Sequence, residues 1–311
     1  MRNIKSPAFP KGRKNVLRID INSTTMFMPR KVLEDKLIKL LAEDVGEGDV
    51  TSAAVVPSEC TAQAEVTAKA EGVVAGLEEA AVLAEALGLQ VAVEVADGDS
   101  VKKGDVLMSI SGDAATILTV ERTLLNLLSR MSGIATATRN LTAIIKKAHL
   151  KTRVAATRKS TLGMLYFDKK AVVVGGGDSH RLHLDDMVLI KDNHIVVSGG
   201  LAKAIKLAKQ NASFSKKIEV EVTAVADALK AVELGVDIVM LDNFSPEQIK
   251  EAVTLVKKGG FGGKVLLEAS GGITSENLID YASAGVDILS LGELTHSVKA
   301  LDMSLEIVKT A

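Results

Sequence analysis

Residues 235–242 read GVDIVMLD, and residues 285–292 read GVDILSLG. The two stretches start 50 residues apart, which is the length of two units of one strand and one helix. Each begins with a glycine that ends a predicted helix and continues into an apolar strand. Buried repetition of strand, helix and strand is typical of a parallel sheet with right-handed crossovers. The repeat therefore predicts an α/β domain with a parallel sheet in the second half of the chain.

Short apolar strands alternate with amphipathic helices throughout this second half. Six such strands in a row favour a barrel, or most of one, over a doubly wound sheet. A dinucleotide-binding fold is further disfavoured because no Gly-x-Gly-x-x-Gly opens a helix after the first strand. The predicted strands are Thr152–Ala156, Met187–Ile190, Ile218–Val222, Asp237–Leu241, Val265–Ala269 and Asp287–Leu291, and the helices between them are Leu201–Lys209, Ala224–Leu234, Pro246–Lys257 and Ser275–Ala284.

The first half of the chain has a different pattern, in which longer helices flank a few strands. We expect residues 1–27 to form a disordered extension. The other predicted elements are a helix at Pro29–Ala42, a loop at Asp44–Thr51, strand-like alternation at Ala62–Gly76, a helix at Leu77–Leu87, strands at Val91–Val95 and Val106–Ile110, a helix at Ile117–Met131 and, after Ser132-Gly133, another helix to about Ala148.

The composition excludes several classes of protein. A net charge of −1, with 25% charged residues, gives no electrostatic footprint for nucleic acid or an anionic membrane. No apolar run approaches the ~20 residues that a membrane helix needs, and the basic N-terminus lacks the apolar core of a secretory signal. Cys60 is the only cysteine, so no intrachain disulfide is possible. We therefore expect a protein of the reducing cytoplasm.

Polar or glycine-rich segments stand at the ends of all six predicted strands. A single charge at a strand end is usually a solvated loop residue, but chemistry in α/β barrels sits at the carboxyl ends of the strands. Six such segments at one rim therefore indicate a functional site. They are Arg158-Lys159, Lys191-Asp192-Asn193-His194, Glu219 with Glu221, Asp242-Asn243, Glu268 with Ser270-Gly271-Gly272, and Gly292-Glu293.

The cations near this rim indicate an anionic ligand. Arg158, Lys159, Arg181 and Lys191 together suit a ligand with several anionic groups. Arginine binds carboxylate or phosphate through paired hydrogen bonds. The sequence therefore predicts a partner that bears carboxylate or phosphate.

Other residues at the rim indicate a phosphorylated ligand that binds with Mg²⁺. Glu221 and Asp242 are hard oxygen ligands, suited to Mg²⁺ held through water and phosphate. Ser270-Gly271-Gly272 leads into the helix predicted at Ser275, where backbone N–H groups can hold a phosphate. Gly292 lets a second backbone segment come close, as in the usual barrel phosphate site. The whole set predicts a site for a phosphorylated, Mg²⁺-bound sugar beside a carboxylate-bearing partner.

With these residues the chain resembles the quinolinate phosphoribosyltransferase (nicotinate-nucleotide pyrophosphorylase, decarboxylating) family over roughly residues 30–308. The type I phosphoribosyltransferase signature is absent, which fits this separate type II family. The family usually has Pro where this chain has Leu162 and Arg where it has Leu165. The resemblance rests on Glu121-Arg122-Thr123, Ser132-Gly133-Ile134-Ala135-Thr136, Thr157-Arg158-Lys159-Ser160-Thr161, Gly175-Gly176-Gly177, His180-Arg181-Leu182, Leu189-Ile190-Lys191-Asp192-Asn193-His194, Glu219-Val220-Glu221, Leu241-Asp242-Asn243, Glu268-Ala269-Ser270-Gly271-Gly272-Ile273 and Leu294-Thr295-His296.

The resemblance implies a fold and an activity. The implied fold is an N-terminal α/β sandwich domain at residues 28–135, an incomplete α/β barrel at residues 136–296, and a C-terminal helix at residues 297–311, about Leu301–Lys309, that packs back on the first domain. The implied assembly is a homodimer or a multiple of dimers. The implied reaction transfers phosphoribosyl from phosphoribosyl pyrophosphate to quinolinate with decarboxylation, and gives nicotinate mononucleotide, pyrophosphate and CO₂ for NAD synthesis.

The resemblance also implies roles for single residues. Arg122 would reach into the partner subunit's site. The two carboxylates of quinolinate would be bound by Arg158, His180, Arg181 and Lys191. Lys159 would meet the pyrophosphate or ribose of phosphoribosyl pyrophosphate, and Glu221 and Asp242 would hold Mg²⁺ and the ribose hydroxyls.

Two rival interpretations stay open. One is a related phosphoribosyltransferase-like paralogue group linked to molybdenum use, which shares the Thr-Arg-Lys and His-Arg segments but loses the Ile190–His194 segment that is intact here. The other is a barrel that only binds a phosphorylated ligand. The presence of Lys159, Glu221 and Asp242 argues against a site without catalysis.

Overall fold

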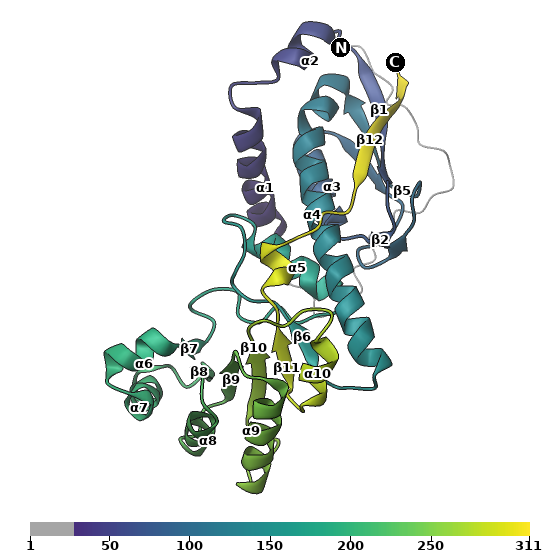
Figure 1. Ribbon diagram of the computed structural model, residues 1–311. Coiled ribbons are helices and arrows are strands. Elements are labelled where there is room, and N and C mark those ends of the chain that lie inside the picture. Colours follow the sequence, from purple (N-terminus) through teal and green to yellow (C-terminus); the bar gives the residue numbers. More distant parts are fainter. Residues whose placement is uncertain (1–27) are drawn as a thin grey trace.

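Two domains share one long helix in the computed structural model, which describes residues 28–311 (Figure 1). The helix, α4 (Ala114–Lys147), runs from the N-terminal domain down beside the barrel strands. The extension expected at residues 1–27 lies outside the described residues. Although α4 has 34 residues, neither it nor any other described helix is long and apolar enough to cross a membrane.

The N-terminal domain is built on a four-stranded antiparallel sheet. Along β1 (Thr61–Ala68), one of its two inner strands, every second side chain from Ala62 to Ala68 is buried, because successive side chains of a strand point to opposite faces. Helices pack on the buried face and complete the sandwich. The strands of this sheet have the order β12 (Met303–Thr310), β1 (Thr61–Ala68), β5 (Val106–Asp113) and β3 (Gln90–Val93). The helices are α1 (Arg30–Val45), α2 (Val50–Val55) and α3 (Leu77–Ala86). A separate two-stranded sheet pairs β2 (Gly72–Val73) with β4 (Ser100–Val101).

The loop predicted at Asp44–Thr51 is too long, because α2 begins within it. The carboxylate of Asp49 accepts hydrogen bonds from the backbone N–H groups of Thr51 and Ser52 and so caps the helix. This aspartate is a helix-start signal that the Gly- and Asp-rich composition of the segment concealed.

The two helices predicted around Ser132-Gly133 are one continuous helix, so this prediction was wrong. Glycine lowers helix propensity, but here it serves packing. A Cβ atom at Gly133 would lie 3.0 Å from the Cα atom of Ala300 and collide with the carbonyl oxygen of Lys299. The hydroxyl of Ser132 is buried and accepts a hydrogen bond of 2.9 Å from the backbone N–H of Ala75. The Ser-Gly pair therefore lets other segments pack closely against α4.

The C-terminal helix expected at about Leu301–Lys309 is also wrong. This segment lies against the first domain as strand β12, antiparallel to β1 from Ala62↔Thr310 to Ala68↔Met303. Ile307, Val308 and Thr310 are β-branched and suit a pleated strand. The pairing also covers the edge of β1, whose backbone groups would otherwise have no partner on that side.

The second domain is an incomplete α/β barrel. Its six parallel strands have the order β6-β11-β10-β9-β8-β7, and in the described part of the chain β6 and β7 do not pair with each other. All six lie within two residues of their predicted bounds. The strands are β6 (Arg153–Ala155), β7 (Val188–Ile190), β8 (Ile218–Val222), β9 (Ile238–Asp242), β10 (Leu266–Ser270) and β11 (Ile288–Ser290). The four helices predicted between them are present, with the observed bounds α7 (Leu201–Asn211), α8 (Val225–Glu233), α9 (Pro246–Lys258) and α10 (Leu278–Ser283).

The sequence repeat has a structural counterpart, because its two copies form β9 and β11 on either side of β10. The aspartate of each copy accepts a hydrogen bond from the backbone of the neighbouring strand. Asp237 accepts from the N–H of Ile218 at 2.7 Å, and Asp287 accepts from the N–H of Leu267 at 2.9 Å. The repeated Gly-Val-Asp therefore fixes the start of one strand against the next.

Three helices of the second domain were not predicted. They are α5 (Leu165–Val174), α6 (Asp192–Ser198) and α11 (Glu293–His296). Two of them, α6 and α11, are shorter than two full turns, which leaves little periodicity to detect. Helix α5 carries three charged residues in its centre, so its sequence lacks the usual amphipathic pattern.

Candidate active site

A cavity of about 690 Å³ opens at the carboxyl ends of the barrel strands. Residues at or beyond the ends of all six strands line it, as barrel geometry requires. The cavity brings together every residue to which the sequence assigned a role except Arg122: Arg158, Lys159, His180, Arg181, Lys191, Glu221, Asp242, Ser270, Gly271, Gly272 and Gly292. Arg122 lies exposed on α4 and does not line this cavity.

One wall of the cavity is cationic. Arg158 and Lys159 are exposed in the loop after β6. Arg181 lies three residues after Asp178, which pairs with Ala155 of β6 in an isolated β-bridge. Partial burial lowers the pKa of Arg181 from its ordinary value, and the nearby charge of Arg158 lowers it further. Because the two guanidinium groups repel each other, an anionic ligand between them would be stabilised.

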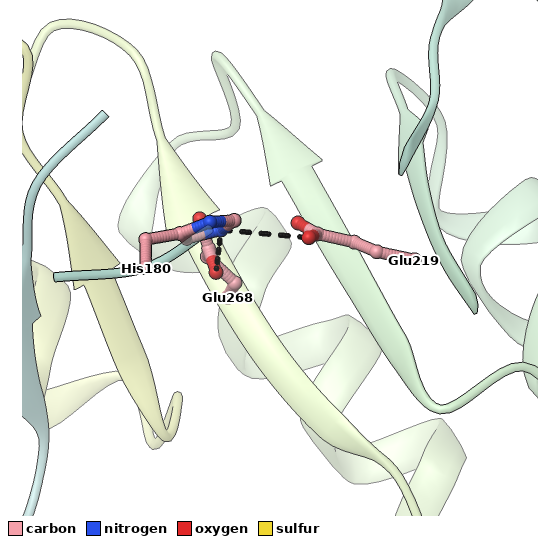
Figure 2. A group of neighbouring side chains, drawn as sticks. All are labelled: His180, Glu219 and Glu268. Carbon is pink, nitrogen blue, oxygen red and sulfur yellow. Dashed lines mark ion pairs between the residues drawn. The ribbon is translucent and has the colours of Figure 1, made fainter. Parts of the chain in front are cut away.

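Below this wall, His180 lies between two buried glutamates (Figure 2). Its Nε2 atom is 3.4 Å from a carboxylate oxygen of Glu219 on β8 and 3.3 Å from one of Glu268 on β10. Both glutamate side chains are fully buried, and no other donor in residues 28–311 hydrogen-bonds to their oxygens. His180 itself has a φ of 52°, a conformation that few residues other than glycine adopt. The three residues therefore fix a strained turn at the floor of the cavity.

Charge in this cluster is set by burial and by the carboxylates. Burial disfavours the cationic form of His180, but the two glutamates outweigh it and raise the pKa of His180 to about 9. Burial also raises the pKa of Glu219, with a further contribution from the charge of Glu268. The backbone N–H of Arg181 donates to Nδ1 of His180 at 2.7 Å. This bond opposes the raised pKa, because a second proton can reach Nδ1 only if the N–H turns away.

A carboxylate pair occupies the adjoining strands. Glu221 on β8 forms an ion pair with Lys191, and Asp242 ends β9. Burial raises the pKa of Asp242, and the charge of Glu221 raises it further. Two carboxylates that repel each other in one cavity are a suitable donor set for a divalent cation, which would relieve the repulsion. The residues present therefore fit Mg²⁺.

The glycine-rich segment after β10 has a different setting from the predicted one. Helix α10 begins at Leu278 and not at Ser275, so Gly271 and Gly272 do not lie at a helix N-terminus. Instead Gly271 has a φ of 94°, and a Cβ atom there would lie 2.8 Å from Cγ of Asn243. Asn243 in turn donates to the carboxylate of Asp242 at 2.7 Å. The glycine therefore leaves room for a side chain that orients Asp242.

Gly292 has a similar effect at the end of β11. A Cβ atom there would lie 3.1 Å from Cδ of Lys159 and 3.0 Å from Cδ2 of His296. The absence of a side chain at Gly292 lets the side chains of Lys159 and His296 approach the backbone. His296 lines the cavity but was not assigned a role from the sequence. Glu219 and Glu268 also had no assigned role, although each stands as a charged residue inside an apolar strand.

The chain matches one protein family along most of its length. Residues 134–306 match the family described as "Quinolinate phosphoribosyl transferase, C-terminal domain", and residues 49–132 match "Quinolinate phosphoribosyl transferase, N-terminal domain". Both matches lie within the part of the chain that the structure describes.

Individual proteins agree with these matches. A probable nicotinate-nucleotide pyrophosphorylase (carboxylating) of Methanothermobacter thermautotrophicus is 42% identical over 273 residues, which cover 88% of this chain and 98% of that protein. The nicotinate-nucleotide pyrophosphorylase (carboxylating) of Homo sapiens is 36% identical over 93% of this chain and 96% of its own length. The crystal structure of NadC from Streptococcus pyogenes superposes with a TM-score of 0.83 at 35% identity, and covers 92% of this chain and 99% of that one.

Proposed function

The chain belongs to the quinolinate phosphoribosyltransferase family, and we propose how its own residues carry out the reaction of that family. The reaction is transfer of phosphoribosyl from phosphoribosyl pyrophosphate to quinolinate with loss of CO₂, in NAD synthesis. The observation that supports the assignment of the site is the cavity of about 690 Å³ at the strand ends, which joins a cationic wall to a carboxylate pair.

The cationic wall binds quinolinate in this proposal. Arg158, Arg181 and Lys191 supply positive charge for two carboxylates, with His180 beneath them and Arg122 from a second subunit. A substrate with one carboxylate would leave part of this charge without a partner, which costs binding free energy. Nicotinate should therefore be a poor substrate, and equal turnover of the two acids would contradict this assignment.

Lys159 acts on the leaving group. Displacement of pyrophosphate from C1 of the ribose develops negative charge on the pyrophosphate and positive charge on the sugar. The pyridine nitrogen carries no proton when it attacks, so no general base is needed, and positioning with electrostatic stabilisation supplies the catalysis. Lys159 would neutralise the pyrophosphate, while Glu221 and Asp242 would stabilise the cationic ribose. Ser270, Gly271, Gly272 and Gly292 line the same cavity and would hold phosphate oxygens through their backbone, without the helix N-terminus that the sequence indicated.

Mg²⁺ would be held by Glu221 and Asp242 together with the ribose hydroxyls and pyrophosphate. When bound, it supplies positive charge that neutralises the pyrophosphate. In its presence Lys191 would be free to leave Glu221 for a carboxylate of quinolinate. Removal of divalent cations with EDTA should abolish turnover, and addition of MgCl₂ should restore it; turnover that persists without divalent cations would contradict the magnesium site.

Decarboxylation follows from the charge on the ring. Once the nitrogen is bonded to C1 of the ribose it is positive, and this charge stabilises the electron pair left when the adjacent carboxylate departs as CO₂. The second carboxylate is farther from the nitrogen and stays on the ring. The ring carbon that loses CO₂ then takes up one proton from water, which gives nicotinate mononucleotide. The residues of the cationic wall would need only to hold the ring in place during this step.

The assembly is a homodimer or a multiple of dimers in this proposal, placed in the cytoplasm. The exposed position of Arg122 on α4, outside the cavity of its own subunit, supports a role in the site of a partner. Sedimentation at micromolar concentrations tests the assembly, because a monomer with full activity would contradict a shared site.

The experiment that tests the proposed function compares substrates on one protein. Purified enzyme is incubated with phosphoribosyl pyrophosphate, MgCl₂ and either quinolinate or nicotinate, and the nucleotide product is followed by chromatography. We expect nicotinate mononucleotide from quinolinate, and little product from nicotinate. The variant Arg181→Ala should lose quinolinate turnover, and an unchanged turnover would contradict the placement of the substrate.

A further inference from the structure

Helix α5 carries three consecutive charged residues that the reaction as proposed does not use. Asp168, Lys169 and Lys170 are 0%, 0% and 2% exposed. Charged side chains are almost never fully buried unless they are paired, because removal of an ion from water is costly. Each member of this triplet therefore needs partners, and each finds them in a different part of the molecule.

Asp168 holds the loop that carries Arg158 and Lys159. Its carboxylate forms two hydrogen bonds with Arg130 of α4, at 2.7 and 2.8 Å, and accepts a third of 2.5 Å from the hydroxyl of Ser160. A paired bond between a guanidinium and a carboxylate fixes orientation as well as distance. The loop is thereby tied to the helix at the residue that follows Lys159.

The same arginine reaches a second anchor of this loop. Arg130 donates to the backbone oxygen of Thr295 at 2.9 Å, and the buried hydroxyl of Thr295 donates to the backbone oxygen of Lys159 at 2.6 Å. Two successive loop residues, Lys159 and Ser160, are thus held by side chains that share Arg130. The loop has no helix or strand of its own to fix it.

Lys169 holds the other cation-bearing segment. Its ammonium group donates to the backbone oxygen of Ser179 and, at 3.0 Å, to that of Arg181. These two carbonyls flank His180, whose positive φ makes the turn strained. Burial lowers the pKa of Lys169 to about 8, so the helix keeps this lysine at an electrostatic cost. The contact restrains the backbone on both sides of His180.

Lys170 points away from the cavity. It forms ion pairs with Glu78 and, at 2.7 Å, with Glu79, both on α3 of the N-terminal domain. Helix α5 is therefore anchored to the first domain by one residue of the triplet, while the other two reach the loops of the site.

We propose that Asp168 and Lys169 are positioning residues, which hold the Arg158-Lys159 loop and the His180-Arg181 turn at the separation that a dicarboxylate substrate needs. This inference rests on the proposed function of the cavity. Neither residue lines the cavity, so each acts through the loop to which it bonds. Lys169 positions Arg181 and thereby affects the binding of quinolinate. Asp168, together with Thr295, positions Lys159 and thereby affects the departure of pyrophosphate.

The first test is a double-mutant cycle on quinolinate affinity, measured by titration calorimetry with the full-length enzyme. We expect Lys169→Met to weaken quinolinate binding about tenfold or more in the wild-type background. In the Arg181→Ala background the same change should cost less than about twofold, because the group it positions is gone. An equal loss in both backgrounds would overturn the proposal, since a purely structural role is additive.

A matched control shows whether the loss of quinolinate affinity is specific to Lys169 or follows from removing any lysine that bonds to a backbone carbonyl. Lys209 donates to the backbone oxygen of Leu234 at 2.6 Å, outside the cavity. Lys209→Met should leave quinolinate affinity within about twofold of the wild type. If the wild-type protein itself binds no quinolinate, the proposed function fails; if it binds and Lys169→Met binds equally well, only the positioning role fails.

The second test needs no buried charge to be removed, so it holds even if Lys169→Met does not fold. Thr295→Val deletes the hydroxyl that bonds to Lys159, and Thr295→Ser keeps it. We expect Thr295→Val to lower kcat about tenfold or more with little change in the KM for quinolinate, and Thr295→Ser to keep most of kcat. A normal kcat in Thr295→Val would overturn the anchoring of Lys159.

Discussion

The ion pairs of Lys170 give a prediction about stability and its dependence on pH. Lys170→Met would leave Glu79 without its cation in a fully buried site beside Asp97. Removal of one partner of a buried ion pair costs about 3–5 kcal/mol, because it leaves an uncompensated charge. At about 2–4 °C per kcal/mol for proteins of this size, the unfolding temperature should fall by on the order of 10 °C at pH 8.

The loss should be smaller in mild acid. Burial raises the pKa of Glu79 to about 7, above its ordinary value of 4.5, so the folded protein binds the extra proton between about pH 4.5 and 7. The contribution of Glu79 to the stability of the wild type thus falls as the pH rises through this window. Without Lys170 the pKa of Glu79 should rise further. At pH 5.5 Glu79 is then neutral in the variant, and the penalty of Lys170→Met should shrink to about half or less.

Differential scanning calorimetry at pH 5.5 and pH 8 measures this difference. The double variant Lys170→Met with Glu79→Leu should recover most of the stability at pH 8, because an apolar pair replaces the ions. Lys209→Met, which removes an exposed lysine, should change the unfolding temperature little at either pH. An equal loss at both pH values, or no recovery in the double variant, would show that the charge of Glu79 is not what destabilises Lys170→Met.

Three further predictions concern the active site. Gly271→Ala should raise the KM for Mg²⁺-phosphoribosyl pyrophosphate about tenfold or more, because its Cβ atom would displace Asn243; Gly263→Ala, at another positive φ but in open space, should not. Lys159→Ala should lower kcat about 10²-fold or more while quinolinate binding stays near normal, and a normal kcat would remove that lysine from the leaving group. Mixed subunits of Arg122→Ala and Lys159→Ala should regain activity if one site uses both chains, and no gain in proven hybrids would contradict the shared site.

The barrel and its rim could be predicted because the information is local in the sequence. Each buried strand is a short apolar run, and parallel topology brings all carboxyl ends to one rim. Residues such as Arg158, Lys191 and Asp242 therefore come together without knowledge of tertiary contacts. The repeat at residues 235–242 and 285–292 indicated the same fold, and the structure places its copies on either side of one strand.

The features that were missed depend on contacts between distant segments. Glu219 and Glu268 meet at His180 across an intervening strand, which no spacing in the sequence indicates. Asp168 and Lys169 look like surface charges, and only their partners on other elements explain their burial. The C-terminal segment forms a strand because β1 offers it an open edge, which local propensity alone does not reveal.

The most direct test of the proposed reaction follows the two carboxylates of quinolinate separately. Quinolinate labelled with ¹⁴C in the carboxylate beside the nitrogen is incubated with the enzyme, phosphoribosyl pyrophosphate and MgCl₂, and CO₂ and nucleotide are counted. We expect one labelled CO₂ for each nicotinate mononucleotide formed, and loss of both products in Arg181→Ala. A nucleotide that retains the label, or undiminished turnover in that variant, would contradict this expectation.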